Sequence, residues 1–158
     1  MKFRFVKYLL TFCMVMAFLA KSSAQVSLRK KHYNLEPAGT AMAGYDPVSY
    51  HTSKSPREGQ RKWSFQHHGV SYLFSSKENM EQFKLHPDDY EPQYGGWCAY
   101  AMGETGEKVQ VDPETFKIID NKLYLFYNFY FTNTLKKWNK DEARLKSDAD
   151  SNWAAAIR

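Results

Sequence analysis

The side chains of this sequence that could bind a metal ion or act as a nucleophile are a few sulfur and imidazole groups. Cys98 follows Gly95-Gly96, a pair without side chains that lets a ligand or a partner backbone approach closely. Met102 comes four residues after Cys98, so in a helix the two sulfurs would share one face and form a soft pair suited to Cu(I). His51 and the pair His67-His68 are the candidate imidazole ligands.

Each of these groups also has an ordinary structural explanation, which the spacing leaves open. A lone cysteine in an aromatic-rich segment is often a small buried hydrophobe, a methionine such as Met102 is commonly part of a core, and His67-His68 falls where a solvated turn is expected. The sequence contains no H-x-x-x-H, C-x-x-C or H-E-x-x-H spacing, so a metal site could only be assembled from distant segments. It also lacks the G-x-S-x-G elbow of serine hydrolases and a phosphate-binding loop.

The first residues, 1–24, are predicted to be a signal peptide. Basic residues precede the apolar run 8–20, which is too short to span a bilayer, and small residues come directly before a cut at Gln25. An uncleaved anchor is the alternative, which the short apolar run disfavours. The mature protein is therefore expected to be exported, to the periplasm or the extracellular space.

Export changes what Cys98 can do. Because Cys13 is removed with the signal peptide, Cys98 becomes the one thiol of the mature chain in an oxidising compartment. It is then expected to be buried, metal-bound, oxidised or paired with another molecule. We expect partial accessibility, because Gly95-Gly96 leaves no side chains to cover the sulfur from that side.

The charge balance argues against nucleic acid as a partner. The chain has 22 Lys and Arg residues and 17 Asp and Glu residues, but four of the basic residues lie in the predicted signal peptide, which holds no acid. Phosphate-backbone binding needs a clustered positive surface. The one basic cluster of the mature chain, 29–31, is expected to be a solvated tail, and no further apolar run is long enough for an integral membrane protein.

The patterning of the mature chain predicts an α+β fold with one domain over 42–158, preceded by a polar arm over 25–41. Aromatic and polar residues alternate on both sides of His68-Gly69 and of Asp120-Asn121, which indicates two β-hairpins. The other expected elements are a short strand at 48–50, a short helix at about 76–85 and a helical tail within 132–157. No internal repeat is visible.

The order of these landmarks resembles the YHS domain family. The motifs that carry the resemblance are DPV at 46–48, SYLFSS at 71–76, HPDDY at 86–90, YGGWCAY at 94–100 and KLYLFYN at 122–128. The core of the match covers about residues 43–92, and the longer pattern resembles the secreted, stand-alone YHS proteins. The resemblance implies metal handling, with copper as the expected ion. Metal-type members use three cysteines whose positions here are held by Ser49, Ser75 and Asn79, so that metal site does not carry over residue by residue.

The sequence thus predicts an exported binding protein of the YHS type that handles a transition metal, with copper as the candidate ion. Its predicted metal ligands are Cys98, His51, Met102, His67 and His68. Two alternatives stay open. In one, the protein is a thiol redox protein with Cys98 as the nucleophile, and in the other it is a non-catalytic interaction domain with Cys98 in its core. An enzyme is the less favoured interpretation.

Overall fold

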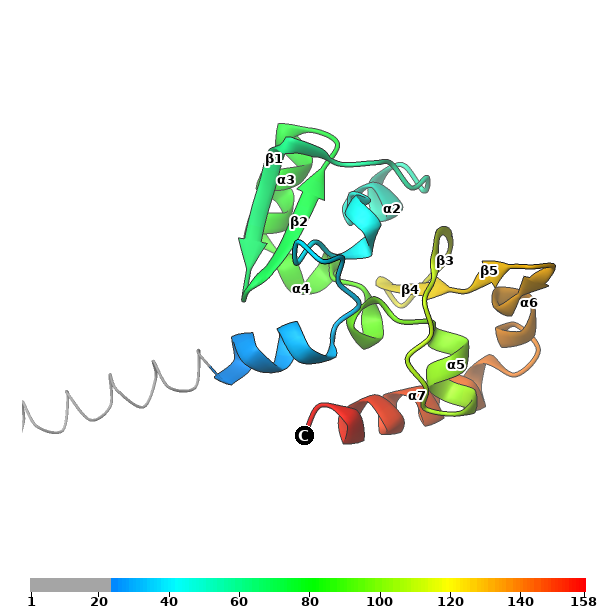
Figure 1. The fold of residues 1–158 in the computed structure, drawn as a ribbon. Helices are drawn as coiled ribbons and strands as arrows, with labels where there is room; N and C mark the ends of the chain where they lie inside the picture. Colours follow the sequence, from blue (N-terminus) through cyan, green and yellow to red (C-terminus); the bar gives the residue numbers. More distant parts are fainter. Residues whose placement is uncertain (1–23) are drawn as a thin grey trace, which may run out of the picture.

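The computed structural model describes residues 24–158 as an α+β fold in which small antiparallel hairpins are flanked by helices (Figure 1). After a helix over 24–32, the elements are η1 (Met42–Gly44), α2 (Ser49–Thr52), β1 (Gln60–His67), β2 (Val70–Phe74), α3 (Lys77–Leu85), α4 (Pro87–Tyr90), η2 (Gln93–Gly96), α5 (Ala99–Glu104), β3 (Asp112–Ile119), β4 (Lys122–Phe126), β5 (Asn128–Phe129), β6 (Thr132–Asn133), α6 (Thr134–Trp138) and α7 (Glu142–Ala156). The predicted fold class is confirmed. The predicted signal peptide, apart from Ala24, lies outside the described residues.

The first hairpin, β1 with β2, forms where the alternating pattern predicts it. Phe65 pairs with Tyr72 and His67 with Val70. The turn residues have φ values of 44° at His68 and 81° at Gly69. A two-residue turn with both φ values positive matches the twist of the flanking strands.

The helix α3 covers the aromatic face of this hairpin. Phe83 is fully buried, and its ring centroid lies 4.8 Å from that of Tyr72 and 5.2 Å from that of Phe74. The side chain of Ser76 caps the helix by accepting the N–H of Asn79. The predicted helix and its packing against the hairpin are confirmed.

The segment after Asp46 is helical, so the strand predicted at 48–50 was wrong. The carboxylate Oδ1 of Asp46 accepts the N–H of Val48 at 2.9 Å, and the hydroxyl of Ser49 donates to the carbonyl of Asp46 at 2.7 Å. These local bonds close a turn that continues directly into α2. The hydrogen bonds between side chains and backbone at Asp46 and Ser49 therefore favour a helical turn over the strand that the alternation of Val48 and Tyr50 predicts.

The second hairpin, β3 with β4, also forms as predicted, with positive φ values at Asp120 and Asn121. Trp138 of α6 is fully buried and its ring centroid lies 5.5 Å from that of Phe126. The long helix α7 packs against α5 at Gly103, where an added Cβ would come 2.4 Å from the carbonyl oxygen of Leu145. The helical C-terminal tail is confirmed.

The predicted polar arm, 25–41, is helical in its first part and docks on the rest of the molecule (Figure 1). The indole Nε1 of Trp97 donates to the carbonyl of His32 at 2.7 Å, which fixes the end of this helix. Arg29 is only 8% exposed. The expectation of a solvated tail was wrong for this residue, whereas the two lysines that follow it are exposed.

The two hairpin units repeat one another at a constant offset of 52 residues, so that 40–75 corresponds to 92–127. We call these segments the N repeat and the C repeat. Their long strands begin at Gln60 and Asp112, and both strand pairs have the same register with the irregularity at the same place. The positive φ values at 42–44, 54, 68 and 69 recur at 94–96, 106, 120 and 121.

The repeat is not visible in the sequence, because few residues are identical between the two segments. Between the two segments the residues that are identical at this offset are Gly44, Tyr72, Leu73 and Phe74, which match Gly96, Tyr124, Leu125 and Phe126. The expectation of no internal repeat was therefore wrong. The backbone has kept its turns and register while most side chains differ.

The core consists of two hydrophobic clusters, and the C repeat contributes to both. The first cluster contains Tyr50, Tyr72, Phe74, Phe83 and Cys98, and the second contains Met102, Tyr124, Trp138 and Leu145. Residues of β4 contact both clusters, because Leu123 and Leu125 belong to the first while Tyr124 and Phe126 belong to the second. Among the described residues, no helix has the length and apolar character needed to cross a membrane.

Candidate functional site

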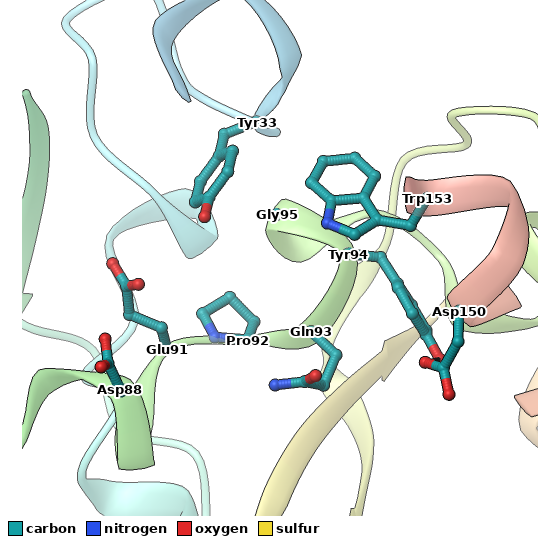
Figure 2. A pocket seen from close by; sticks show the side chains of 9 residues that line it. All are labelled: Tyr33, Asp88, Glu91, Pro92, Gln93, Tyr94, Gly95, Asp150 and Trp153. Atoms are coloured by element: carbon teal, nitrogen blue, oxygen red, sulfur yellow. Dashed lines mark hydrogen bonds between the residues drawn. The ribbon is translucent and has the colours of Figure 1, made fainter. Parts of the chain in front are cut away.

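A pocket of about 220 Å³ lies between the docked N-terminal arm, the chain from α4 to η2, and α7 (Figure 2). Its walls combine the rings of Tyr33 and Trp153 with the carboxylates of Asp88, Glu91 and Asp150. Figure 2 shows Asp88 and Glu91 next to each other on one side and Asp150 beside Tyr94 on the other. Two of these three carboxylates are paired with cations, Glu91 with Arg29 and Asp150 with Lys146.

Glu91 is the buried carboxylate of this pocket and is held in place by two partners. Arg29 donates to both carboxylate oxygens, with Nη1 3.1 Å from Oε2, and the hydroxyl of Tyr72 donates to Oε1 at 2.7 Å. Burial and the neighbouring Glu91 raise the pKa of Tyr72 well above its ordinary value, so this hydroxyl stays a neutral donor. Since a carboxylate offers about four lone-pair sites, Oε2 retains room for one further contact.

His67 and Asp88 complete a group of three potential metal ligands with Glu91. One ligand atom from each lies within 4.8 Å of the other two. The three come from the end of β1, from α4 and from the residue after α4. In the chain from residue 24 onward, no other group of at least three His, Cys, Asp or Glu side chains is this close together.

The surroundings of His67 favour its neutral form. Burial lowers the pKa of the His67 imidazole; the carboxylate of Glu91 opposes this effect, and the positive charge of Arg29 adds to it. A neutral imidazole offers the lone pair that a metal ion needs. The ring centroids of His67 and His68 are 4.1 Å apart, but His68 is not part of the group of three.

Cys98 is fully buried, so the expectation of a partly accessible thiol was wrong. Its Sγ lies 3.4 Å from the backbone nitrogen of Tyr127 and 3.4 Å from the hydroxyl oxygen of Thr134. The neighbouring Gly95 does not open a path to the sulfur, because rings from the N-terminal arm and from α7 fill the space beside it. The thiol acts as an acceptor inside the core.

The other predicted ligands lie in separate places. Met102 follows Cys98 along one helix, but its side chain belongs to the second hydrophobic cluster and that of Cys98 to the first. The ring of His51 packs edge-on against Tyr90 at 5.3 Å between centroids, and its Nδ1 is 3.4 Å from the side-chain oxygen of Asn121. Of the five predicted ligands, the structure places only His67 in the group of three.

Ser49, Ser75 and Asn79, the residues that the predicted resemblance aligns with cysteines of metal-type members, gather around Asp46. Ser49, Ser75 and Asn79 line a second, polar pocket of about 360 Å³. The Oδ2 of the buried Asp46 accepts the N–H and the hydroxyl of Ser75, at 2.9 and 2.6 Å, and the side-chain amide of Asn79 at 2.6 Å. The donors and acceptors of this network are oxygen and nitrogen atoms, which bind soft metal ions poorly.

Sequence reasoning missed Arg29, Glu91 and the role of Asp88. Asp88 lies in an acidic turn where solvation is the ordinary expectation, and Glu91 stands 62 residues from the arginine that pairs with it. No local pattern relates two side chains at that separation. The available signal is the concentration of acids at 88–91 directly before Pro92.

Comparisons of this chain with protein-family models, with curated proteins and with solved structures found no match. The resemblance to the YHS family therefore stays a prediction that rests on the motifs. The function has to be argued from the side chains of the site.

Proposed function

We propose that this protein is an exported binding module of the YHS type that takes up a divalent transition-metal ion between His67, Asp88 and Glu91. The observation that carries the proposal is the convergence within 4.8 Å of the imidazole of His67, at the end of β1, and the carboxylates of Asp88 and Glu91, on the turn of α4. Ligand atoms about 2.0–2.2 Å from one ion lie roughly 3–4 Å apart, so small side-chain rotations would close the site.

The donor set favours some ions over others. One nitrogen and two oxygen donors suit Zn²⁺, Co²⁺ or Mn²⁺ better than Cu(I), which prefers sulfur. The burial of Cys98 and its separation from Met102 support this choice of ion. The same burial removes support from the thiol redox alternative: although Cys98 stands at the N-terminus of α5, a reactive thiolate also needs access to its reaction partner.

Arg29 sets the expected strength of binding. Its guanidinium already binds both oxygens of Glu91, so an incoming ion has to share this carboxylate with a positive charge. We therefore expect weaker binding than at a structural zinc site. Replacing the cation in Arg29→Met should strengthen binding, because Glu91 is then free to turn fully toward the ion.

The direct test is calorimetric titration of the exported protein with ZnCl₂, using neighbouring residues as matched controls. We expect His67→Ala and Asp88→Asn to weaken zinc binding at least about 10-fold. His68→Ala and Asp89→Asn remove the same chemical groups one position away and should leave zinc affinity almost unchanged. Equal losses in both pairs, or no zinc binding by the parent protein, would refute the site.

A second variant separates this proposal from the hypothesis based on sulfur ligands. Cys98→Ser should retain zinc binding, because Cys98 is not one of the three ligands. Loss of binding in a folded Cys98→Ser protein, with retention in His67→Ala, would instead point to a site around the thiol. The folded state of each variant is checked by its thermal unfolding curve.

A further inference from the structure

The C repeat carries an insertion that the N repeat lacks. After β2 the chain enters α3 at Lys77, whereas after β4 it first forms the small hairpin of β5 and β6 before α6 begins. Asn128 pairs with Asn133 and Phe129 with Thr132, so the hairpin has a two-residue turn. Figure 1 shows β5 at the edge of the molecule, above α6 and far from the C-terminus.

The tip of this insertion presents three aromatic rings in a row to solvent. Phe129 is 44% exposed, Tyr130 is 90% exposed and Phe131 is 112% exposed. The other large apolar side chains that are exposed among the described residues, such as Leu85, stand singly in the sequence. Isolated exposure is ordinary, but a run of exposed rings marks an interaction surface.

The backbone of the tip is strained in a way that folding does not explain. Tyr130 and Phe131 have φ values of 49° and 64°, in the left-handed region that bulky residues avoid. The turns of the two larger hairpins place His68-Gly69 and Asp120-Asn121 at the same kind of position, and these residue types tolerate it. The rings of Tyr130 and Phe131 gain almost no burial in return. Strained and exposed side chains of this kind indicate a role in binding.

The flank of the tip is basic. Lys136 and Lys137 lie on α6, directly after the hairpin, and Lys140 follows; all three are exposed. The sequence from 128 to 140 contains no acid. At the base of the hairpin, the side-chain amide of Asn128 donates to Oδ2 of Asp112 at 3.3 Å, and the acids Asp141 and Glu142 follow Lys140.

We propose that this hairpin, 128–133, docks the protein on a bilayer that contains anionic phospholipids. Aromatic side chains favour the interface between headgroups and acyl chains, and lysines beside them attract lipid phosphates. A projecting tip of three residues also offers much less area than the roughly 1,200 Å² that a stable protein interface buries. A bilayer accepts such a tip without a matching groove.

We expect the docking to be weak and reversible, because the hairpin carries few groups that bind lipid. Three rings and three lysines supply one shallow apolar anchor and one electrostatic attraction, and stable attachment requires such signals in combination. The electrostatic part is screened by salt, so binding should decrease as ionic strength rises. This surface is independent of the metal ligands, which come from the N repeat and from α4 with the residue after it.

The test uses flotation of the exported protein with vesicles of phosphatidylcholine and phosphatidylglycerol, compared with vesicles of phosphatidylcholine alone. The decisive variant is Tyr130→Asn with Phe131→Gly, which places the preferred residues of this turn type at the tip. We expect its binding to anionic vesicles to decrease at least about 10-fold while its melting temperature stays equal or rises. Unchanged flotation of this variant would overturn the proposal.

Two further measurements address charge and depth. Lys136→Gln with Lys140→Gln should weaken binding at low salt, whereas Lys54→Gln with Lys77→Gln, on the N repeat and α3, should not. In a Phe131→Trp protein, brominated lipids should quench the added fluorescence, which reports insertion of the tip whatever residues 1–24 do. An unquenched tryptophan, or lipid-free self-association that the tip variant abolishes, would show a protein-binding surface and contradict docking on a bilayer.

Discussion

The N repeat and the C repeat place different side chains at the same structural position. Asp46 and Cys98 are equivalent, and each accepts the N–H of the residue that follows its hairpin. The Oδ2 of Asp46 accepts the backbone N–H of Ser75 at 2.9 Å. The Sγ of Cys98 accepts the backbone N–H of Tyr127 at 3.4 Å. The fold therefore requires a buried acceptor at this place, and a carboxylate and a sulfur both meet the requirement with different strength.

Two further pairs of equivalent positions carry different side chains in the two repeats. Gly103 lets α7 approach the C repeat closely, and Ile119 at the end of β3 packs against the second cluster. The equivalent residues of the N repeat are His51, whose ring packs against Tyr90 of α4, and His67, whose ring packs against Phe83 of α3. The same backbone thus packs on the long helix α7 in one repeat and carries imidazole side chains beside shorter helices in the other.

The largest effect is expected where the N repeat packs on its own helix. Phe83→Ala removes a fully buried ring that contacts Tyr72 and Phe74, and should lower the free energy of unfolding by about 3–5 kcal/mol. Leu85→Ala, on the same helix but 74% exposed, should change it by less than about 0.5 kcal/mol. Denaturant unfolding of both variants measures the difference. Equal effects would disprove the packing.

The next prediction compares the stability contributed by the two equivalent hydrogen-bond acceptors, Asp46 and Cys98. Asp46→Ala leaves the N–H groups of Val48 and Ser75 without their partner, and should cost about 3 kcal/mol or more. Cys98→Ala removes a weaker acceptor and leaves a small cavity, so its cost should be about 1–2 kcal/mol. If the cysteine variant is the less stable one in denaturant unfolding, the two positions do not share one role.

The burial of Cys98 adds a chemical readout to that comparison. In the folded protein the thiol should react slowly with an alkylating reagent, and at the ordinary rate once denaturant unfolds the chain. Rapid alkylation of the folded protein would show that the thiol is reachable and would restore the redox hypothesis.

The sequence predicts the parts of this fold that depend on neighbouring residues. Alternating rings on both sides of a polar turn indicate each hairpin, and the serine before α3 marks a helix start. The short helix α2 was missed, because one aspartate side chain decides the local conformation there. Two apolar residues in alternation are too weak a signal against such a bond.

Of the three residues of the candidate site, only His67 could be predicted from the sequence. His67 stands out as a ligand type, but its partners are joined to it through the fold and not through spacing. Arg29 was assigned to a solvated tail because three basic residues in a row are usually solvated, and its burial depends on Glu91 at a separation of 62 residues. Contacts of that kind follow from tertiary packing, which a single sequence does not display.

A smaller effect compares equivalent backbone positions in the two repeats. Lys54 and Gly106 both have positive φ, 51° and 76°, but only glycine adopts this conformation without strain. Gly106→Ala should destabilise the protein by about 1 kcal/mol, whereas Lys54→Gly should stabilise it by up to about 0.5 kcal/mol. Thermal unfolding measures both. Destabilisation by Lys54→Gly would mean that its side chain contributes packing beyond the shared backbone.

The smallest effect concerns pH and the residue that takes the place of Gly103 in the N repeat. Burial lowers the pKa of His51 below its ordinary value near 6.5, although its contact with Asn121 opposes this, and its Nε2 is buried without a partner. Because the unfolded chain then binds the proton more readily, the stability from this group is complete above about pH 6.5 and decreases as pH falls toward the lower folded pKa. His51→Gln should therefore lose less stability between pH 7.5 and pH 5 than the parent protein. Coincident curves for the parent protein and His51→Gln would remove His51 as a source of pH dependence.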